Sequence, residues 1–256
     1  MPLNKDNRSY VERLFRMLKE YVFSLVGKRA LAIFCHGEFS KRAIERTYPE
    51  LNIVKIPYGI EPKAGREKVF SRKKKTQERT TVLFFGGIRT DKGIEQLSEL
   101  TRLCPDIHFI VAGKPMGYTK SEIENLFKGR NNVELILDFI RDEDVEELFL
   151  KADILILPYN KHFAGQSGPL TISTIYRVPV VAARVGDMGE DIERYGLGVT
   201  TDSNDPLLLK EALTVILNMD LEKLQKAHDE YYLRGLWTNV GKLIEEYYNK
   251  SEIKPI

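Results

Sequence analysis

The chain has 256 residues, enough for one large domain or for one domain and part of a second. Hydrophobic residues make up 43% and charged residues 30%, a balance that is typical of a globular protein and excludes a disordered one. No stretch approaches eighteen uncharged apolar residues, and the two cysteines, Cys35 and Cys104, lie beside apolar residues, so we expect no transmembrane helix, disulfide framework or structural zinc.

The net charge of +2 hides an asymmetry along the chain. Residues 1–79 hold 19 Lys and Arg against 9 Asp and Glu, whereas the remainder holds 20 against 28. The unbroken basic run at 72–75 is, by itself, typical of a solvated linker. The alternative is that the N-terminal third faces an anionic surface. Lipid headgroups fit this better than nucleic acid, which we do not expect, because aromatic residues do not interleave with the basic ones.

The first sixty residues predict a leading helix and one β-α-β unit. Residues 9–12 have the spacing of a capping box, and apolar residues at helical spacing continue to Leu25. A strand at 30–35, a helix at 41–46 and a strand at 53–57 follow. The N-terminus lacks the apolar core of a signal peptide, so we expect a cytoplasmic location, with membrane association as an option.

From Thr80 onward, short apolar runs alternate with segments of helical periodicity. This alternation predicts an α/β fold with a doubly wound parallel sheet. The chain ends in helices predicted at 206–217, 221–232 and 236–248. The predicted strands are residues 81–85, 107–112, 133–137, 154–158, 179–183 and 198–200.

Two loops after predicted strands have features of a phosphate site, because ligands of open parallel sheets bind beyond the carboxyl ends of the strands. Residues 86–93 combine paired glycines with Arg89 and Lys92; an ordinary turn with solvated charges is the alternative. Residues 165–169 precede a predicted helix, whose N-terminal amides favour phosphate; a plain Ser167 N-cap is the alternative.

Other candidate groups carry weaker signals. Residues 185–191 could bind a metal or sugar hydroxyls through Glu190, or simply be acids at a helix start. His36 and His162 fall in loops, whereas His108 and His228 are expected to be structural or solvated. No two histidines have metal-ligand spacing, and no Ser/His/Asp set can be assembled, so hydrolase chemistry is not predicted.

Residues 81–250 resemble the C-terminal, donor-binding domain of family-4 retaining glycosyltransferases, which have the two-domain GT-B fold. The resemblance also reaches back to a shortened N-terminal domain. The matching motifs stand in family order: residues 83–93, 109–113, 152–159, 166–168, 178–182, 185–190, 195–198 and 205–206, then Trp237 with its helix, and upstream residues 30–36 and 56–60.

The resemblance implies four segments. Residues 1–62 form an N-terminal remnant, 63–79 a basic linker, 80–235 a Rossmann-like domain that binds a nucleotide-sugar, and 236–256 a terminal helix that crosses back. Family positions that often carry paired glutamates hold Ala164 and Ile172 here, which places the chain closer to the members with Gln-Ser-Gly in this loop.

The site residues are carried over from the same resemblance. Arg89 and Lys92 would stabilise the donor diphosphate as the sugar leaves, in place of an essential metal or other cofactor, and His36 is the third catalytic candidate. The donor-binding candidates are Gly86, Gly87, Lys114, Phe139, Ile140, Gln166, Ser167, Gly168, Pro169, Leu170 and Glu190.

The resemblance implies transfer of a sugar, with retention, from a UDP- or GDP-sugar to an acceptor that could be lipid-linked. The alternative is a non-catalytic donor-binding subunit, with a homodimer or a partner chain supplying the missing half. A third and weaker option is another GT-B activity, such as nucleotide-sugar epimerisation.

Overall fold

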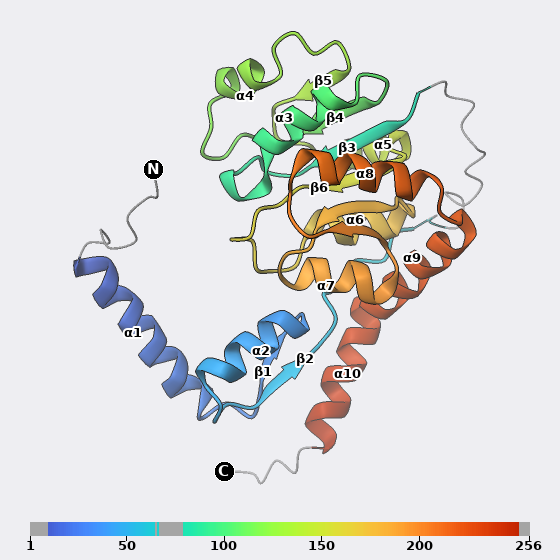
Figure 1. Ribbon diagram of the computed structural model, residues 1–256. Coiled ribbons are helices and arrows are strands. Elements are labelled where there is room, and N and C mark those ends of the chain that lie inside the picture. Colours follow the sequence, from blue (N-terminus) through green and yellow to red (C-terminus); the bar gives the residue numbers. More distant parts are fainter. Residues whose placement is uncertain (1–9, 65, 67–78, 251–256) are drawn as a thin grey trace.

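The larger unit of the chain is a six-stranded parallel sheet with helices on both faces (Figure 1). The computed structural model describes residues 10–64, 66 and 79–250. The strand order β5-β4-β3-β6-β7-β8 confirms the predicted doubly wound α/β class. The strands are β3 (Thr81–Phe85), β4 (His108–Ala112), β5 (Val133–Ile136), β6 (Ile154–Leu157), β7 (Val180–Ala183) and β8 (Gly198–Thr201).

The central strands are buried because each is a continuous aliphatic run covered on both faces. Leu83, Leu155 and Val181 have no exposed surface. Helix α8 packs on α3 and β7 over one face, whereas α5, α6 and α9 pack together on the other. The helices are α3 (Ile94–Leu103), α4 (Lys120–Leu126), α5 (Asp142–Lys151), α6 (Gly168–Tyr176), α7 (Gly186–Tyr195), α8 (Pro206–Leu217), α9 (Leu221–Gly235) and α10 (Trp237–Lys250).

The N-terminal unit is small. It contains α1 (Tyr10–Gly27), β1 (Ile33–Cys35), α2 (Glu38–Thr47) and β2 (Ile53–Lys55), and the two strands pair in parallel. Its buried core cluster is small and consists of Cys35, Leu51 and Ile53 among the described residues. Strand β1 starts later than predicted because the amide of Ala30 still donates to the carbonyl of Val26 in the turn after α1. The predicted capping box at the start of α1 lies outside the described residues.

The bridge at Ile60 and helix α10 are among the contacts that join the units. Ile60 forms a short parallel bridge at the break between α9 and α10: its amide donates to Gly235 O at 2.7 Å, and its carbonyl accepts from Trp237 N at 3.2 Å. Helix α10 then runs back along the N-terminal unit (Figure 1), where the Tyr247 ring lies 5.7 Å from that of Phe34. In the structure, α10 therefore contacts the N-terminal unit.

Part of the segment expected to be a solvated linker is docked on the larger unit. Arg66 donates to Asp229 at 2.7 Å and to the carbonyls of Thr174 and Ile175, and its guanidinium lies 4.0 Å from the centre of the Tyr232 ring. The partner of Arg66 is 163 residues later in the chain. The charges near Arg66 in the sequence give no indication of such a contact. The basic run at 72–75 lies outside the described residues.

Candidate functional site

The candidate site lies where the strand order reverses. Strand β3 pairs with β4 on one side and with β6 on the other, so the loops that follow β3 and β6 diverge from neighbouring positions. Open α/β sheets bind ligands in the crevice formed at such a point. These are the two loops in which the sequence predicts a phosphate site.

Lys92 is buried in the first loop. It closes a 3₁₀ turn, Thr90–Lys92, and is only 8% exposed. Its Nζ donates to the Tyr159 hydroxyl at 3.1 Å and lies 4.8 Å from the centre of that ring. Burial, and then the charge of Arg89, lower the pKa of Lys92 to about 8. No carboxylate in the described part of the chain forms an ion pair with Lys92, although the nearby charge of Asp91 favours the ammonium and partly opposes the effect of burial.

Arg89 is already paired within its own loop. Its guanidinium donates to both carboxylate oxygens of Asp91, at 2.9 and 2.7 Å. The pair holds the pKa of Asp91 below its ordinary value. The sequence predicts two cations for the ligand, but in the structure the Arg89 charge is largely compensated by Asp91. The 3₁₀ turn brings the Arg89 and Asp91 side chains together. A contact between residues two positions apart cannot be predicted from the periodicity of the sequence.

The second loop brings a helix N-terminus next to Lys92. Ser167 is the N-cap of α6, and its hydroxyl accepts from the amide of Leu170 at 3.4 Å. The same hydroxyl lies 3.4 Å from the Tyr159 hydroxyl, so a polar chain runs from Lys92 through Tyr159 to Ser167. A methyl group placed on Gly86 would lie 3.4 Å from Lys92 Nζ and 3.3 Å from the Pro169 ring.

The N-terminus of α6 retains two amides for a ligand. Within the described chain, neither the Ser167 N–H nor the Gly168 N–H donates to a protein acceptor. Nothing lies within 4 Å of the position of a Gly168 side chain, so the approach is open. A helix N-terminus carries a partial positive charge that favours anions. The side chain of Leu170, by contrast, is in the core, so only its backbone lies near the site.

Tyr159 was missed as a site residue by sequence reasoning. It has no exposed surface, and burial raises the pKa of its phenol well above the ordinary value. A neutral phenol accepts from Lys92 and reaches Ser167, and so links the two loops. The available signal was its place just after β6, where an aromatic residue with a polar end fits a half-polar pocket.

Phe139, Ile140 and Lys114 follow β5 and β4, on the far side of β3 from the Ser167 loop. The Phe139 ring is 72% exposed, whereas Ile140 packs against the core. A methyl group on Gly87 would lie 2.7 Å from the sulfur of Met116, just after Lys114. An exposed ring of this kind is free to stack on a flat group such as a nucleobase.

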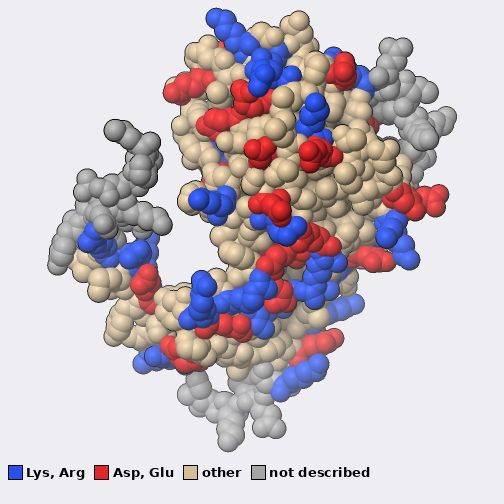
Figure 2. Space-filling view, in the orientation of Figure 1, with Lys and Arg blue, Asp and Glu red and all other residues tan. Residues whose placement is uncertain are grey.

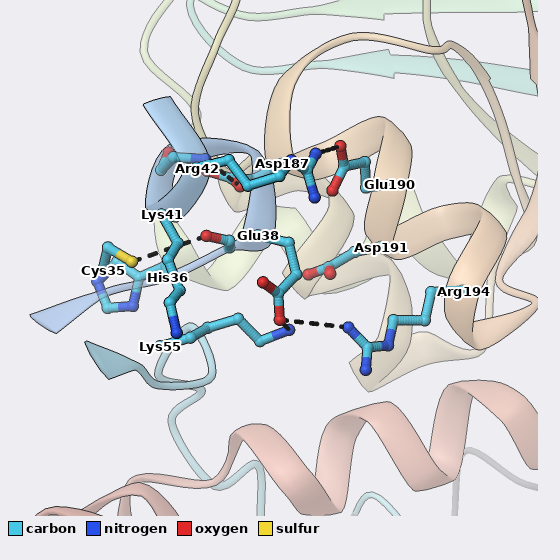
Figure 3. A network of polar contacts seen from close by, with 12 residues as sticks. Cys35, His36, Glu38, Lys41, Arg42, Lys55, Asp187, Glu190, Asp191 and Arg194 are labelled. Atoms are coloured by element: carbon cyan, nitrogen blue, oxygen red, sulfur yellow. Dashed lines mark hydrogen bonds and ion pairs between the residues drawn. The ribbon is translucent and has the colours of Figure 1, made fainter. Parts of the chain in front are cut away.

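Gln166, His36 and Glu190 lie where the two units meet, and Figure 3 shows His36 and Glu190 there. Gln166 Nε2 donates to Asp191 Oδ2 at 2.7 Å and to the carbonyl of His36 at 3.4 Å. His36 Nδ1 lies 3.3 Å from the Pro57 carbonyl, and Glu190 forms an ion pair with Arg42. The side chains of Gln166 and Glu190 and the backbone carbonyl of His36 are therefore engaged in contacts between units, whereas Lys92, Gly86, Ser167 and Pro169 cluster at the switch point.

Neither a metal cluster nor a membrane span is seen in the described residues. No group of three or more His, Cys, Asp or Glu side chains there could hold a metal ion. Among the same residues, no helix has the length and apolar character needed to cross a bilayer.

Residues 65–232, more than half of the chain, match the protein family described as "Glycosyl transferases group 1". The chain belongs to this family. A curated relative, D-inositol 3-phosphate glycosyltransferase of Corynebacterium diphtheriae, is 26% identical over 182 residues, which are 66% of this chain and 42% of that protein. The match therefore spans less than half the length of that relative.

Several solved structures share the fold at low sequence identity. Sucrose-phosphate synthase of Thermosynechococcus elongatus is 14% identical with a TM-score of 0.72, covering 98% of this chain and 64% of that one. A glycosyltransferase of Rickettsia africae is 17% identical with a TM-score of 0.70, covering 92% and 67%. TarM of S. aureus, in a complex that contains UDP, is 15% identical with a TM-score of 0.68, covering 90% and 45%.

Proposed function

We propose that this group 1 glycosyltransferase binds the diphosphate of a nucleotide-sugar at the switch point and transfers the sugar with retention, as family-4 enzymes do. One observation carries the proposal: a buried Lys92 ammonium without a carboxylate partner faces the open N-terminus of α6. A desolvated cation beside free amides is a site built for an anion. The UDP bound to TarM, a relative in fold, supports a nucleotide as that anion.

The chemistry follows from where charge develops. When the bond between sugar and diphosphate breaks, negative charge grows on the leaving phosphate oxygen. Fixed donors in a water-poor site stabilise such charge better than water does. Lys92 and the amides of Ser167 and Gly168 would supply these donors, held in place by Tyr159. In this proposal the cation takes the place of an essential metal, and Phe139 stacks on the base.

Helix α1 supports a membrane-linked acceptor. It projects away from the larger unit (Figure 1), and Figure 2 shows the molecule hollowed between the two. Its C-terminal end packs on the described chain, through Phe23 against Tyr48 and Gly27 against Leu51. The apolar residues that are at least half exposed are Leu14, Phe15, Met17, Leu18, Tyr21, Val22 and Val26.

The charge of the opposite flank of α1 supports lipid as the occupant of this face. Arg13, Arg16 and Lys19 lie there, and of the acidic side chains described in the helix only Glu20 accompanies them, forming an ion pair with Arg16 at 3.6 Å. An amphipathic helix with a basic polar flank lies in the headgroup region of anionic membranes. We therefore propose that α1 docks on such a surface and brings the cleft to a lipid-linked acceptor.

Replacing Leu18 with aspartate should weaken sedimentation with phosphatidylglycerol vesicles by about tenfold or more, because the change removes an exposed leucine that would insert into the bilayer and adds a charge that the anionic headgroups repel. Leu217→Asp on α8 is the matched control, since Leu217 is also about half exposed, and it should leave binding unchanged. Unchanged vesicle binding by Leu18→Asp would contradict lipid docking through α1. A dimer in solution that Leu18→Asp dissociates would instead show that this face of α1 contacts protein.

A non-catalytic, donor-binding subunit is the second candidate. The observation that favours it is the N-terminal unit itself, whose described sheet has only two strands and whose α1 face lacks a cover. A partner chain or a second copy would then complete the cleft. Transfer activity that appears only after a partner is added would favour this candidate over the first.

A thermal-shift screen of UDP, GDP, ADP and their sugars tests donor binding. A nucleotide diphosphate at 100 times its Kd should add about 2.7 kcal/mol to the free energy of unfolding, or about 5–10 °C in a chain of this size. Nucleoside monophosphates, which lack the second phosphate, should give a smaller shift. No shift with any diphosphate would contradict the proposed donor site.

A further inference from the structure

Helices α2 and α7 meet at their N-termini across the boundary between the two units (Figure 3). Neither helix is capped by its own N-cap side chain: the N-cap residues are Gly37 in α2 and Val185 in α7. The first amides of a helix need acceptors, and each helix start carries a partial positive charge. Two uncapped starts brought close together therefore require an anionic acceptor.

Asp187 fills this position. It is the second residue of α7, and it is only 2% exposed. Its Oδ1 accepts from the amide of Ser40 at 3.0 Å, and its Oδ2 accepts from the Ser40 hydroxyl. Ser40 is the third residue of α2, and its amide is the one that an N-cap side chain ordinarily satisfies. Asp187 thus caps α2 from 147 residues away in the chain.

Gly37 provides the space for this contact. A side-chain carbon at Gly37 would lie 1.9 Å from Asp187 Oδ1, far inside contact distance. The backbone at Gly37 is extended, with φ of −153°, so the requirement is for space and not for an unusual conformation. The absence of a side chain at Gly37 therefore makes room at the start of α2 for the Asp187 carboxylate of α7.

The same residue holds the loop of the candidate site. The amide of Asp187 donates to Ala164 O at 3.2 Å, just before Gln166 and Ser167. Gln166 in turn reaches the His36 carbonyl, next to Gly37. We propose that Asp187 is a positioning residue that caps α2 across the boundary between the two units and so fixes the His36–Gly37 turn against the donor-side loop.

Exposed ion pairs surround this buried contact. Arg194 lies 3.5 Å from Glu38, and Arg42 pairs with Glu190. Figure 2 shows Lys and Arg side chains intermixed with Asp and Glu where the units meet. Because solvent screens such pairs, we expect them to stabilise the boundary between the units less than the Asp187 cap does. This difference provides the control for the test.

Amide hydrogen exchange at Ser40 tests the cap without any assay of activity. Asp187→Ala should speed exchange of the Ser40 amide by about fivefold or more, the effect of losing one capping side chain, while amides of β3 and β6 stay protected. Gly37→Ala, which keeps the carboxylate but removes its space, should loosen the same amide. Arg194→Gln should change exchange at Ser40 by less than about twofold.

Asp187→Asn covers the case in which Asp187→Ala fails to fold, because asparagine keeps the shape of the side chain and one acceptor oxygen. It should raise the exchange rate of the Ser40 amide by less than Asp187→Ala does. Unchanged exchange at Ser40 in Asp187→Ala and Gly37→Ala would overturn the proposal.

The effect of Asp187→Ala on turnover rests on the proposed function. In this variant kcat should fall by about tenfold with donor KM within about twofold, because Lys92 and α6 are untouched. A wild-type chain without transfer activity would refute that function and leave the exchange result standing.

Discussion

Replacing Lys92 with methionine should lower sugar transfer by about 100- to 1000-fold, the effect of removing one fixed donor from a site of developing charge. Affinity for the nucleotide diphosphate should fall as well. The variant should nevertheless be more stable at pH 7, by up to about 3 kcal/mol, because a desolvated cation without a carboxylate partner is replaced by an apolar chain of similar length. Calorimetry with UDP and thermal melting measure the two effects separately.

Lys128→Met is the matched control for this substitution, since Lys128 is exposed in the turn after α4. It should change neither stability nor binding. Weaker binding together with a loss of stability in Lys92→Met would indicate a structural role for Lys92. Undiminished affinity for the diphosphate would contradict its proposed role outright.

The pH dependence of binding gives a second test of Lys92. Its pKa is lowered to about 8, so a growing fraction is neutral above that pH, and a neutral amine attracts a diphosphate less. Affinity for UDP should therefore fall as pH rises through about 8, and bound ligand should raise the pKa by linkage. In Lys92→Met this part of the pH dependence should disappear.

Replacing Gly93 with alanine should destabilise the chain by about 3 kcal/mol or more, which lowers the melting temperature by roughly 6–12 °C. Gly93 adopts a left-handed conformation with φ of +69°, which strains any other residue. A side-chain carbon would also lie 1.8 Å from the Pro158 carbonyl oxygen, so the loops after β3 and β6 would be forced apart. Thermal melting measures the effect.

Gly165→Ala is the control for Gly93, because nothing lies within 4 Å of a side chain there and its backbone is not in the left-handed region. It should change stability by less than about 0.5 kcal/mol. A Gly93→Ala chain that melts within about 2 °C of the wild type would show that the two loops are not in the close contact described.

The sheet could be predicted from the sequence because buried parallel strands are continuous aliphatic runs, which have few other uses in a soluble chain. Strand β3 begins and ends at the predicted residues, and the other five differ by one residue at an end. The two loops of the candidate site follow from the same logic, since the order of strands places their carboxyl ends together.

The contacts between distant segments could not be predicted in this way. Helix α2 begins at Glu38, three residues before its predicted start, and the first turn is capped by Asp187 from the other unit. Arg66 looked like part of a solvated basic segment because its partner, Asp229, belongs to α9. Arg89 pairs with Asp91 through a turn that periodicity does not encode. Each depends on a side-chain partner that only the folded chain brings near.

A crystal structure with bound UDP is the most direct measurement of the proposed donor site. We expect the diphosphate oxygens within hydrogen-bond distance of Lys92 Nζ and of the Ser167 and Gly168 amides, with the uracil ring near Phe139. A diphosphate bound elsewhere, with Lys92 still donating only to Tyr159, would contradict the proposal that the cation and the helix N-terminus act together on an activated sugar.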